Sequence, residues 1–196
     1  MQRIDINLAA LLHGEQSVTT HRPLPAAAEV TVEGSIAAVW DKGKGAVVEV
    51  TSRSVAPDGE PMFDQVMSVF IRGEGGFGGE RGPSGSRSMP HEGSTPDLEV
   101  TLTTREDQAL TYRLSGDRNP LHSDPSFAAL AGFDRPILHG LCTYGFTGRA
   151  LLQGLCEGDP ARFRSMEGRF SSPVFPGESL TVRMWRDGDG AARFST

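Results

Sequence analysis

Residues 137–155 read ILHGLCTYGFTGRALLQGL, and this stretch decides the fold of a chain of 196 residues. Pro136 precedes it, and its apolar pattern ends near Leu155. Apolar side chains would fall on most faces of the helix formed by this stretch, and a helix that is apolar nearly all round is usually buried. We therefore expect one long, buried helix in the second half of the chain.

Strand-like segments flank this helix in the sequence. Apolar and polar residues alternate at Leu98–Leu102 before it, and at Arg164–Phe170 and Leu180–Trp185 after it. Ahead of the long helix, the dipeptide Asp124-Pro125 has the form of an N-cap followed by a first-turn proline, which opens a short helix through Leu130. A buried helix with an antiparallel sheet around it is an α+β arrangement.

The first region of the chain reads as strands alone. Apolar and polar residues alternate over residues 30–40, 46–55 and 63–71, with turn-forming residues such as Pro57-Asp58-Gly59 between the runs. Such runs predict a meander of antiparallel strands. The region offers no candidate for an opening strand or for a long helix.

A stretch rich in Gly, Pro and Ser separates the two regions. It reads GEGGFGGERGPSGSRSMPHEGSTP from Gly73 to Pro96 and has almost no apolar residues, so it cannot form a core. Gly73–Gly78 matches the spacing of a dinucleotide-binding fingerprint, but that fingerprint requires a helix to follow, and Glu80-Arg-Gly-Pro-Ser-Gly cannot form one. We therefore predict strands at 1–72, a linker at 73–97 and a mixed α+β region at 98–196.

Composition excludes several classes of protein. The formal net charge of −6 argues against nucleic acid as the main partner. The chain has no run of about 18 apolar residues, so we expect no membrane span. Two cysteines, Cys142 and Cys156, are too few for a disulfide framework, which fits a reduced cytoplasm.

The segment with the clearest chemistry is YRLSGDRNPLH, residues 112–122. The Asn119-Pro120 step disfavours a helix between Asp117 and His122, and Gly116 allows a backbone conformation that other residues resist. The carboxylate and the imidazole therefore lie on an irregular loop that can turn both toward one water molecule, hold it and exchange its protons. Asn119 can orient the water or hold the loop through its side chain.

A second motif, His139-Gly140, lies near the start of the long helix. Backbone N–H groups in the first turn of a helix have no partner inside it, and they lie at the positive end of the helix dipole. Such an N–H group suits a thioester oxygen that becomes negative during a reaction. Glycine at this position lets a substrate carbonyl approach the backbone closely.

Three motifs carry a family resemblance. GDRNPLH at 116–122 closely resembles the signature of the (R)-specific enoyl-CoA hydratases, also called hydratase 2 or MaoC-like dehydratases. PILHG at 136–140 and PVFPG at 173–177 are similar to further motifs of that family. The resemblance implies the hotdog fold, an antiparallel sheet wrapped around a long central helix. It also implies reversible hydration of trans-2-enoyl-CoA to (R)-3-hydroxyacyl-CoA.

The resemblance also assigns roles to residues of this chain. It makes Asp117 and His122 the acid/base pair, matches Asn119 to the asparagine of the signature and gives the oxyanion N–H to Gly140. Such a set is sufficient to add water to an enoyl thioester, so we expect no metal and no cofactor apart from the CoA thioester that is the substrate. The residues expected to line the substrate site are Tyr112, Gly116, Pro120, His139 and Leu141. Two of them, Tyr112 and His139, also have purely structural interpretations.

The first region resembles the non-catalytic half of the double-hotdog hydratases. The resemblance rests on LHGEQ at 12–16, PLP at 23–25 and GEGGFG at 73–78. It implies a partial N-terminal hotdog before a catalytic C-terminal one, in a family member truncated at both ends that lacks the usual last strand. A half hotdog without its helix would leave one sheet face bare, which favours association. We expect a cytoplasmic homodimer.

Two other functions remain open at this point. One is a remnant that binds acyl thioesters, or acts as a scaffold, without turnover. The other is a dehydratase or thioesterase acting on carrier-protein thioesters, although the intact signature argues against a thioesterase. The acyl chain length does not follow from the sequence. The candidates for CoA-binding cations are Arg118, Arg149, Arg162 and Arg164.

Overall fold

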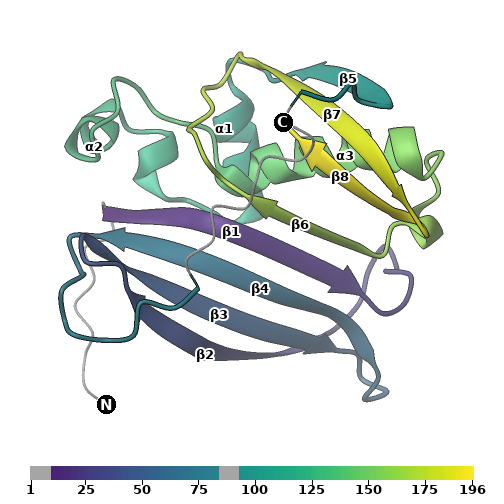
Figure 1. The fold of residues 1–196 in the computed structure, drawn as a ribbon, viewed down its shortest axis with the longest axis horizontal. Coiled ribbons are helices and arrows are strands. Elements are labelled where there is room, and N and C mark those ends of the chain that lie inside the picture. The colour runs from purple at the N-terminus through teal and green to yellow at the C-terminus, as the bar shows by residue number, and fades with distance from the viewer. Residues whose placement is uncertain (1–9, 84–92) are drawn as a thin grey trace. The chain divides into compact units, whose positions relative to one another are not determined.

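The computed structural model describes residues 10–83 and 93–196, and Figure 1 shows how their strands and helices follow one another. The chain divides into two compact units. The first unit comprises residues 1–84 and 164–172, and the second comprises residues 85–163 and 173–196. Each unit contains its own antiparallel sheet.

The first unit is a five-stranded antiparallel sheet with the strand order β2-β3-β4-β1-β6 (Figure 1). Its strands are β1 (Leu11–Thr20), β2 (Thr31–Asp41), β3 (Gly45–Val55), β4 (Pro61–Arg72) and β6 (Ser165–Arg169). The meander β2-β3-β4 confirms the three strands predicted for this region. The turns between them place Gly43 and Gly59 at positive φ, 77° and 85°, where glycine is favoured.

The opening strand β1 corrects the sequence analysis, which found no candidate for it. β1 lies inside the sheet and pairs with β4 on one side and β6 on the other. The register between β1 and β4 shifts between His13 and Glu15, so the strand carries a bulge there. A bulge inserts one extra residue and interrupts the alternation by which a strand is recognised in a sequence. In agreement with the sequence, residues 10–83 contain no α-helix.

The strand β6 comes from a distant part of the chain. It was predicted as a strand at 164–170, but within the region 98–196, whereas its pairing with β1 places it in the first unit. Backbone hydrogen bonds from Thr20 N to Arg164 O (2.8 Å) and from Phe170 N to Gly14 O (2.9 Å) extend this pairing at both ends. Long-range pairing of this kind has no local sequence signal.

The first part of the predicted linker is tied to the first unit. The buried carboxylate of Asp41 accepts hydrogen bonds from the backbone N–H groups of Gly43, Gly76 and Gly78, each at 2.8 Å. These hydrogen bonds hold the pKa of Asp41 below its usual value. Two N–H groups of the glycine-rich loop therefore bind a carboxylate of the protein itself. This agrees with the rejection of a nucleotide-binding site in this loop. Residues 84–92 of the linker lie outside the described residues.

One edge of the first sheet carries exposed apolar side chains. Val32 and Ile36 of β2 have relative exposures of 57% and 60%, and Val39, beyond a register shift in the strand, is 47% exposed. Residues on both faces of this edge strand are exposed, so the bare sheet face expected from the sequence stays a prediction.

The second unit contains a three-stranded antiparallel sheet with the order β5-β7-β8 (Figure 1). The strands are β5 (Leu98–Thr103), β7 (Ser179–Gly188) and β8 (Ala191–Ser195). Val182 and Met184 of β7 are fully buried. β5 and β7 confirm two predicted strands. β8 was not predicted from the sequence, and a tight turn at Asp189-Gly190, with φ of 50° and 74°, leads into it. The expected truncation stays a prediction.

The long helix is α3 (Gly140–Leu155), and it packs against β5 and β7. Its C-terminal end at Leu155 confirms the prediction. A Cβ atom at Gly154 would lie only 3.1 Å from Met184 Sδ, which shows how closely helix and sheet approach each other. The burial differs from the prediction because the structure fully buries only Cys142, Thr147, Ala150 and Leu151 of the helix. Leu141 is 36% exposed.

Two short helices complete the second unit. They are α1 (Gln108–Tyr112), which the sequence did not predict, and α2 (Pro125–Leu130), which it did. The Asp124 carboxylate accepts from Ser126 N at 2.8 Å, as an N-cap should. Across residues 10–83 and 93–196, no helix is long and apolar enough to cross a membrane.

Candidate active site

The loop that carries Asp117 and His122 is shaped by local hydrogen bonds. A short 3-10 turn ends at Gly116, whose φ of 119° is one that L-residues with side chains rarely adopt. Asn119 Oδ1 then accepts from Leu121 N at 3.0 Å, which starts a second 3-10 turn at Pro120. Asp117 Oδ1 accepts from Asn119 N at 3.1 Å. Asn119 therefore holds the loop, which was one of its two expected roles.

The loop is anchored at its far end by the buried side chain of Leu121 and by the ring of His122. Leu121 packs with Ala128, Ala131 and Ile137 in a small apolar cluster. His122 Nδ1 lies 2.9 Å from the backbone oxygen of Ile137. Because a carbonyl oxygen only accepts, Nδ1 carries the proton, and the lone pair of the neutral ring lies on Nε2. Within the described part of the chain, the basic nitrogen of His122 has no hydrogen-bond partner.

Burial also affects the protonation of His122. Removal from water is the main cause that lowers the pKa of His122, while the hydrogen bond to Ile137 O and the charge of Asp117 act in the opposite direction. With a pKa below 6.5, the imidazole is mainly neutral at pH 7. A neutral imidazole is the form that can accept a proton from water.

His139 lies directly against His122. The two rings stack with centroids 3.8 Å apart and an interplanar angle of 27°. His139 is only 2% exposed, and its Nε2 lies 3.2 Å from the backbone oxygen of Asp117. Tyr112 packs on His139 with ring centroids 4.7 Å apart. Both stretches named by the sequence analysis, 112–122 and 139–140, thus meet at these rings.

The side chains of Asp117, His122 and His139 converge. One ligand-type atom from each lies within 4.8 Å of the other two. A metal ion held by both rings would have to lie in both ring planes, at about 2.1 Å from each nitrogen. Planes inclined by only 27° at this separation do not meet so close to the rings. The arrangement thus favours proton transfer over metal binding, and the absence of a metal stays a prediction.

The start of α3 supplies free backbone donors. The carbonyl of His139 accepts from Cys142 N (3.0 Å) and Thr143 N (3.2 Å). The N–H groups of Gly140 and Leu141 have no acceptor within the part of the chain that the structure describes. These two groups lie at the positive end of the helix, next to the stacked imidazoles, where an oxyanion would be stabilised.

The remaining candidate residues differ in their surroundings. Tyr112 is half-buried beside Ala109, Leu138 and Cys142, and burial raises its pKa. Gly116 and Pro120 are exposed on the loop, where they fix its backbone. Contact of Tyr112, Gly116, Pro120, His139 or Leu141 with a substrate stays a prediction.

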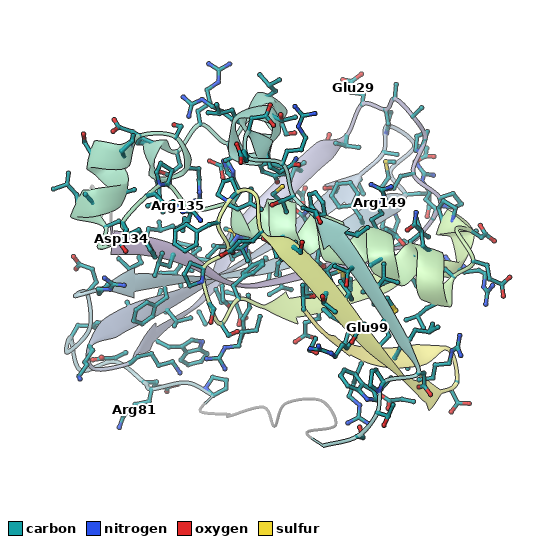
Figure 2. All side chains as sticks on the ribbon, turned by 90° about the horizontal axis from the view of Figure 1, so that it is seen from above. Glu29, Arg81, Glu99, Asp134, Arg135 and Arg149 are labelled. Carbon is teal, nitrogen blue, oxygen red and sulfur yellow. The ribbon has the colours of Figure 1, made fainter. Side chains whose placement is uncertain are left out.

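An open cavity of about 670 Å³ leads to His122. Arg135, Glu106, Glu178 and Leu110 are among the residues that line it. The Arg135 guanidinium lies 4.7 Å from the centroid of the Phe175 ring, and Figure 2 labels Arg135 between α2 and α3, next to Asp134. Arg135 was not predicted from the sequence because a single arginine before a proline has no distinguishing pattern. The four arginines named from the sequence do not line this cavity.

Two family models match the chain. The model described as MaoC like domain matches residues 88–196. The model described as MFE-2 hydratase 2 N-terminal domain matches residues 1–73.

Individual relatives agree with these matches. An enoyl-CoA hydratase of Mycobacterium tuberculosis is 48% identical over 185 residues, which are 94% of this chain and 64% of that protein. The crystal structure of a MaoC-like dehydratase from Phytophthora capsici superposes with a TM-score of 0.87 at 42% identity, covering 96% of this chain and 66% of that one. The chain thus spans about two thirds of the length of these relatives.

The fold is shared with more distant structures as well. A Mycobacterium tuberculosis protein described as a double hotdog fold matches with a TM-score of 0.59 at 12% identity, over 91% of this chain and 64% of that one. The antiparallel sheets with few helices are therefore those of the hotdog fold, as the sequence predicted. With the match over residues 88–196, the chain belongs to the MaoC-like dehydratase family.

Proposed function

We propose that this protein catalyses the reversible addition of water to trans-2-enoyl-CoA, which gives (R)-3-hydroxyacyl-CoA. The observation that carries the proposal is the convergence of the Asp117 and His122 side chains. They lie beside the start of α3, where the Gly140 N–H has no acceptor among the described residues. Family membership, and relatives named as enoyl-CoA hydratases, support the same reaction.

In the proposed mechanism, the Asp117 carboxylate and His122 Nε2 hold one water molecule between them. A proton of the water moves to this acid/base pair as its oxygen forms a bond to the β-carbon. Electrons of the carbon–carbon double bond shift toward the thioester, and the oxygen that becomes negative accepts from Gly140 N–H. The pair then delivers a proton to the α-carbon, so water has been added in full. These steps require no redox or metal cofactor from the protein.

The substrate carrier and the assembly are part of the proposal. We propose a CoA thioester as the substrate, and carrier-protein thioesters are the alternative. The cytoplasmic location and the homodimer stay predictions from the sequence.

A direct assay tests the reaction. The purified protein is incubated with crotonyl-CoA, with a longer 2-enoyl-CoA and with the corresponding carrier-protein thioester, while the loss of enoyl absorbance is followed. We expect turnover of at least one CoA ester, and chiral analysis should find the (R)-3-hydroxy product. Turnover of the carrier-protein ester alone would reassign the substrate. Binding of acyl-CoA without turnover of any ester would support the non-enzymatic alternative.

Arg135 is proposed to bind a phosphate group of CoA. Its guanidinium is held on the Phe175 ring and lines the cavity that leads to His122, and among the described residues it has no ion-pair partner. Replacement by alanine should raise KM for crotonyl-CoA by about fivefold to tenfold, because one charge-assisted contact to phosphate is lost.

Two controls isolate this effect of Arg135. The N-acetylcysteamine thioester of crotonate lacks the phosphates, so its kcat/KM should be the same for Arg135→Ala and for the wild type. Arg162→Ala removes an arginine that pairs with Glu157 at 3.1 Å and does not line the cavity, so it should leave both substrates unaffected. An equal loss of kcat/KM with both thioesters would show that Arg135 does not bind the phosphates of CoA.

A further inference from the structure

His139 is held in a single tautomer by its surroundings. Its Nε2 donates to the backbone oxygen of Asp117, because a carbonyl oxygen can only accept. The other nitrogen, Nδ1, is buried and has no hydrogen-bond partner among residues 10–83 and 93–196. Protonation would place a second N–H group there without an acceptor, which is unfavourable in a buried position. Burial, with the neighbouring His122 as the next cause, lowers the pKa of His139 to about 4. His139 is therefore neutral at pH 7.

The position of His139 joins the two members of the acid/base pair. One edge of the ring binds the backbone of Asp117, and one face carries the ring of His122. His139 immediately precedes Gly140 at the start of α3, so the same residue also connects the pair to the proposed oxyanion donor. The side chain forms no cap hydrogen bond to the helix, so capping does not account for its burial.

We propose that His139 is a positioning residue. Its ring packs against one face of His122, as a floor for that ring, and its Nε2–H fixes the Asp117 backbone. Both contacts hold Asp117 and His122 where they can bind the same water molecule. The inference rests on the proposed hydration reaction and goes beyond the family's acid/base pair. His139 itself exchanges no proton with the substrate, because its free nitrogen is buried and its other nitrogen is occupied by Asp117.

The stacked rings also protect His122 from water. Removal from water is the leading cause of the lowered pKa of His122, and the His139 ring covers one of its faces. Other charged or titratable groups face the pair from several elements, and they remain in place when His139 is changed. These groups are Asp117 on the loop, Tyr112 and Arg113 at the end of α1, Cys142 on α3, and Glu106, Arg135 and Glu178 around the cavity.

Three variants separate the two contacts of His139. His139→Ala removes both the floor and the donor, so we expect kcat to fall between about tenfold and a hundredfold with KM nearly unchanged, because misplacement of reacting groups affects the chemical step. His139→Phe keeps an aromatic floor and loses the donor, so its kcat should be intermediate. Val182→Ala, at a buried position of β7, is the control for a general loss of stability and should keep the wild-type kcat once folded.

The titration of His122 gives a readout that needs no turnover. NMR of the histidine ring signals should show the pKa of His122 rising toward its ordinary value in His139→Ala, because the ring becomes hydrated. It should stay low in His139→Phe. A base works only when neutral, so a raised pKa moves the acidic limb of the kcat/KM profile to higher pH in His139→Ala.

The outcomes distinguish the two levels of the proposal. A folded His139→Ala with wild-type kcat and an unchanged pKa of His122 overturns the positioning role. If His139→Ala does not fold, the test passes to His139→Phe. A raised pKa of His122 in that variant, or an unaltered kcat, overturns the positioning role. Wild-type protein without turnover, but with a pKa of His122 that responds to His139, counts against hydration while it leaves the packing role intact.

Discussion

Replacing His122 with asparagine is expected to lower kcat for enoyl-CoA hydration by about a hundredfold or more, the range of a lost general base. The amide nitrogen of asparagine occupies nearly the place of His122 Nδ1, so it can still donate to Ile137 O and hold the loop. The basic Nε2, which holds the water in the proposed mechanism, is lost. The variant therefore separates the chemistry of the ring from its anchoring. The measurement is steady-state hydration of crotonyl-CoA, together with a melting curve.

Asp117→Asn provides the matched test of the other group. The amide oxygen still accepts from Asn119 N, so the loop keeps its shape while the carboxylate charge is removed. We expect a loss of the same order, about a hundredfold or more. Asp134→Asn removes an exposed acid of the same unit, labelled in Figure 2, and should have no effect. A change near twofold in His122→Asn and Asp117→Asn would remove these residues from the mechanism.

The second large effect is expected at Gly140. Replacement by proline removes the proposed oxyanion donor and should lower kcat by roughly a hundredfold to a thousandfold. The backbone tolerates proline there, because Gly140 is the first residue of α3 and helices accept proline at that position. His139 has φ −58° and ψ 134°, the extended conformation that a following proline requires.

Gly140→Ala is the matched control because it adds a methyl group but keeps the N–H. It should retain much more activity than Gly140→Pro, and the two variants should have similar melting temperatures. Equal kcat values for the two variants, with both folded, would show that the Gly140 N–H does not stabilise the oxyanion. The comparison thus depends on one hydrogen-bond donor.

Local patterns in the sequence predicted elements of both units well. The strands β2, β3 and β4 were visible because their residues alternate over long runs. The helix α2 was visible because Asp124-Pro125 forms a cap that depends on only a few adjacent residues. The Asn119-Pro120 step likewise predicted a loop, and the hydrogen bonds of Asn119 within that loop are local.

Elements that depend on distant partners were missed. β1 has a bulge near Gly14 and is identified as a strand only by its two neighbours, β4 and β6. The anchoring of the glycine-rich loop needs Asp41, which is far from that loop in the sequence. The one-sided burial of α3 follows from which strands it packs against, and a helix that is apolar nearly all round does not reveal that.

For the site, the sequence by itself determined where the candidate groups lie: an acid and an imidazole on an irregular loop, and a glycine at the start of a helix. Their catalytic roles stay a prediction. These features follow from residue types and short-range backbone restrictions. Only the tertiary structure decided that the ring of His139 lies against His122 and binds the backbone of Asp117. The hydrogen bond between His122 and Ile137 O holds the loop beside the start of α3, where His139 lies. Packing between segments that are distant in the chain leaves no periodic pattern in the sequence, so the sequence could not predict this contact.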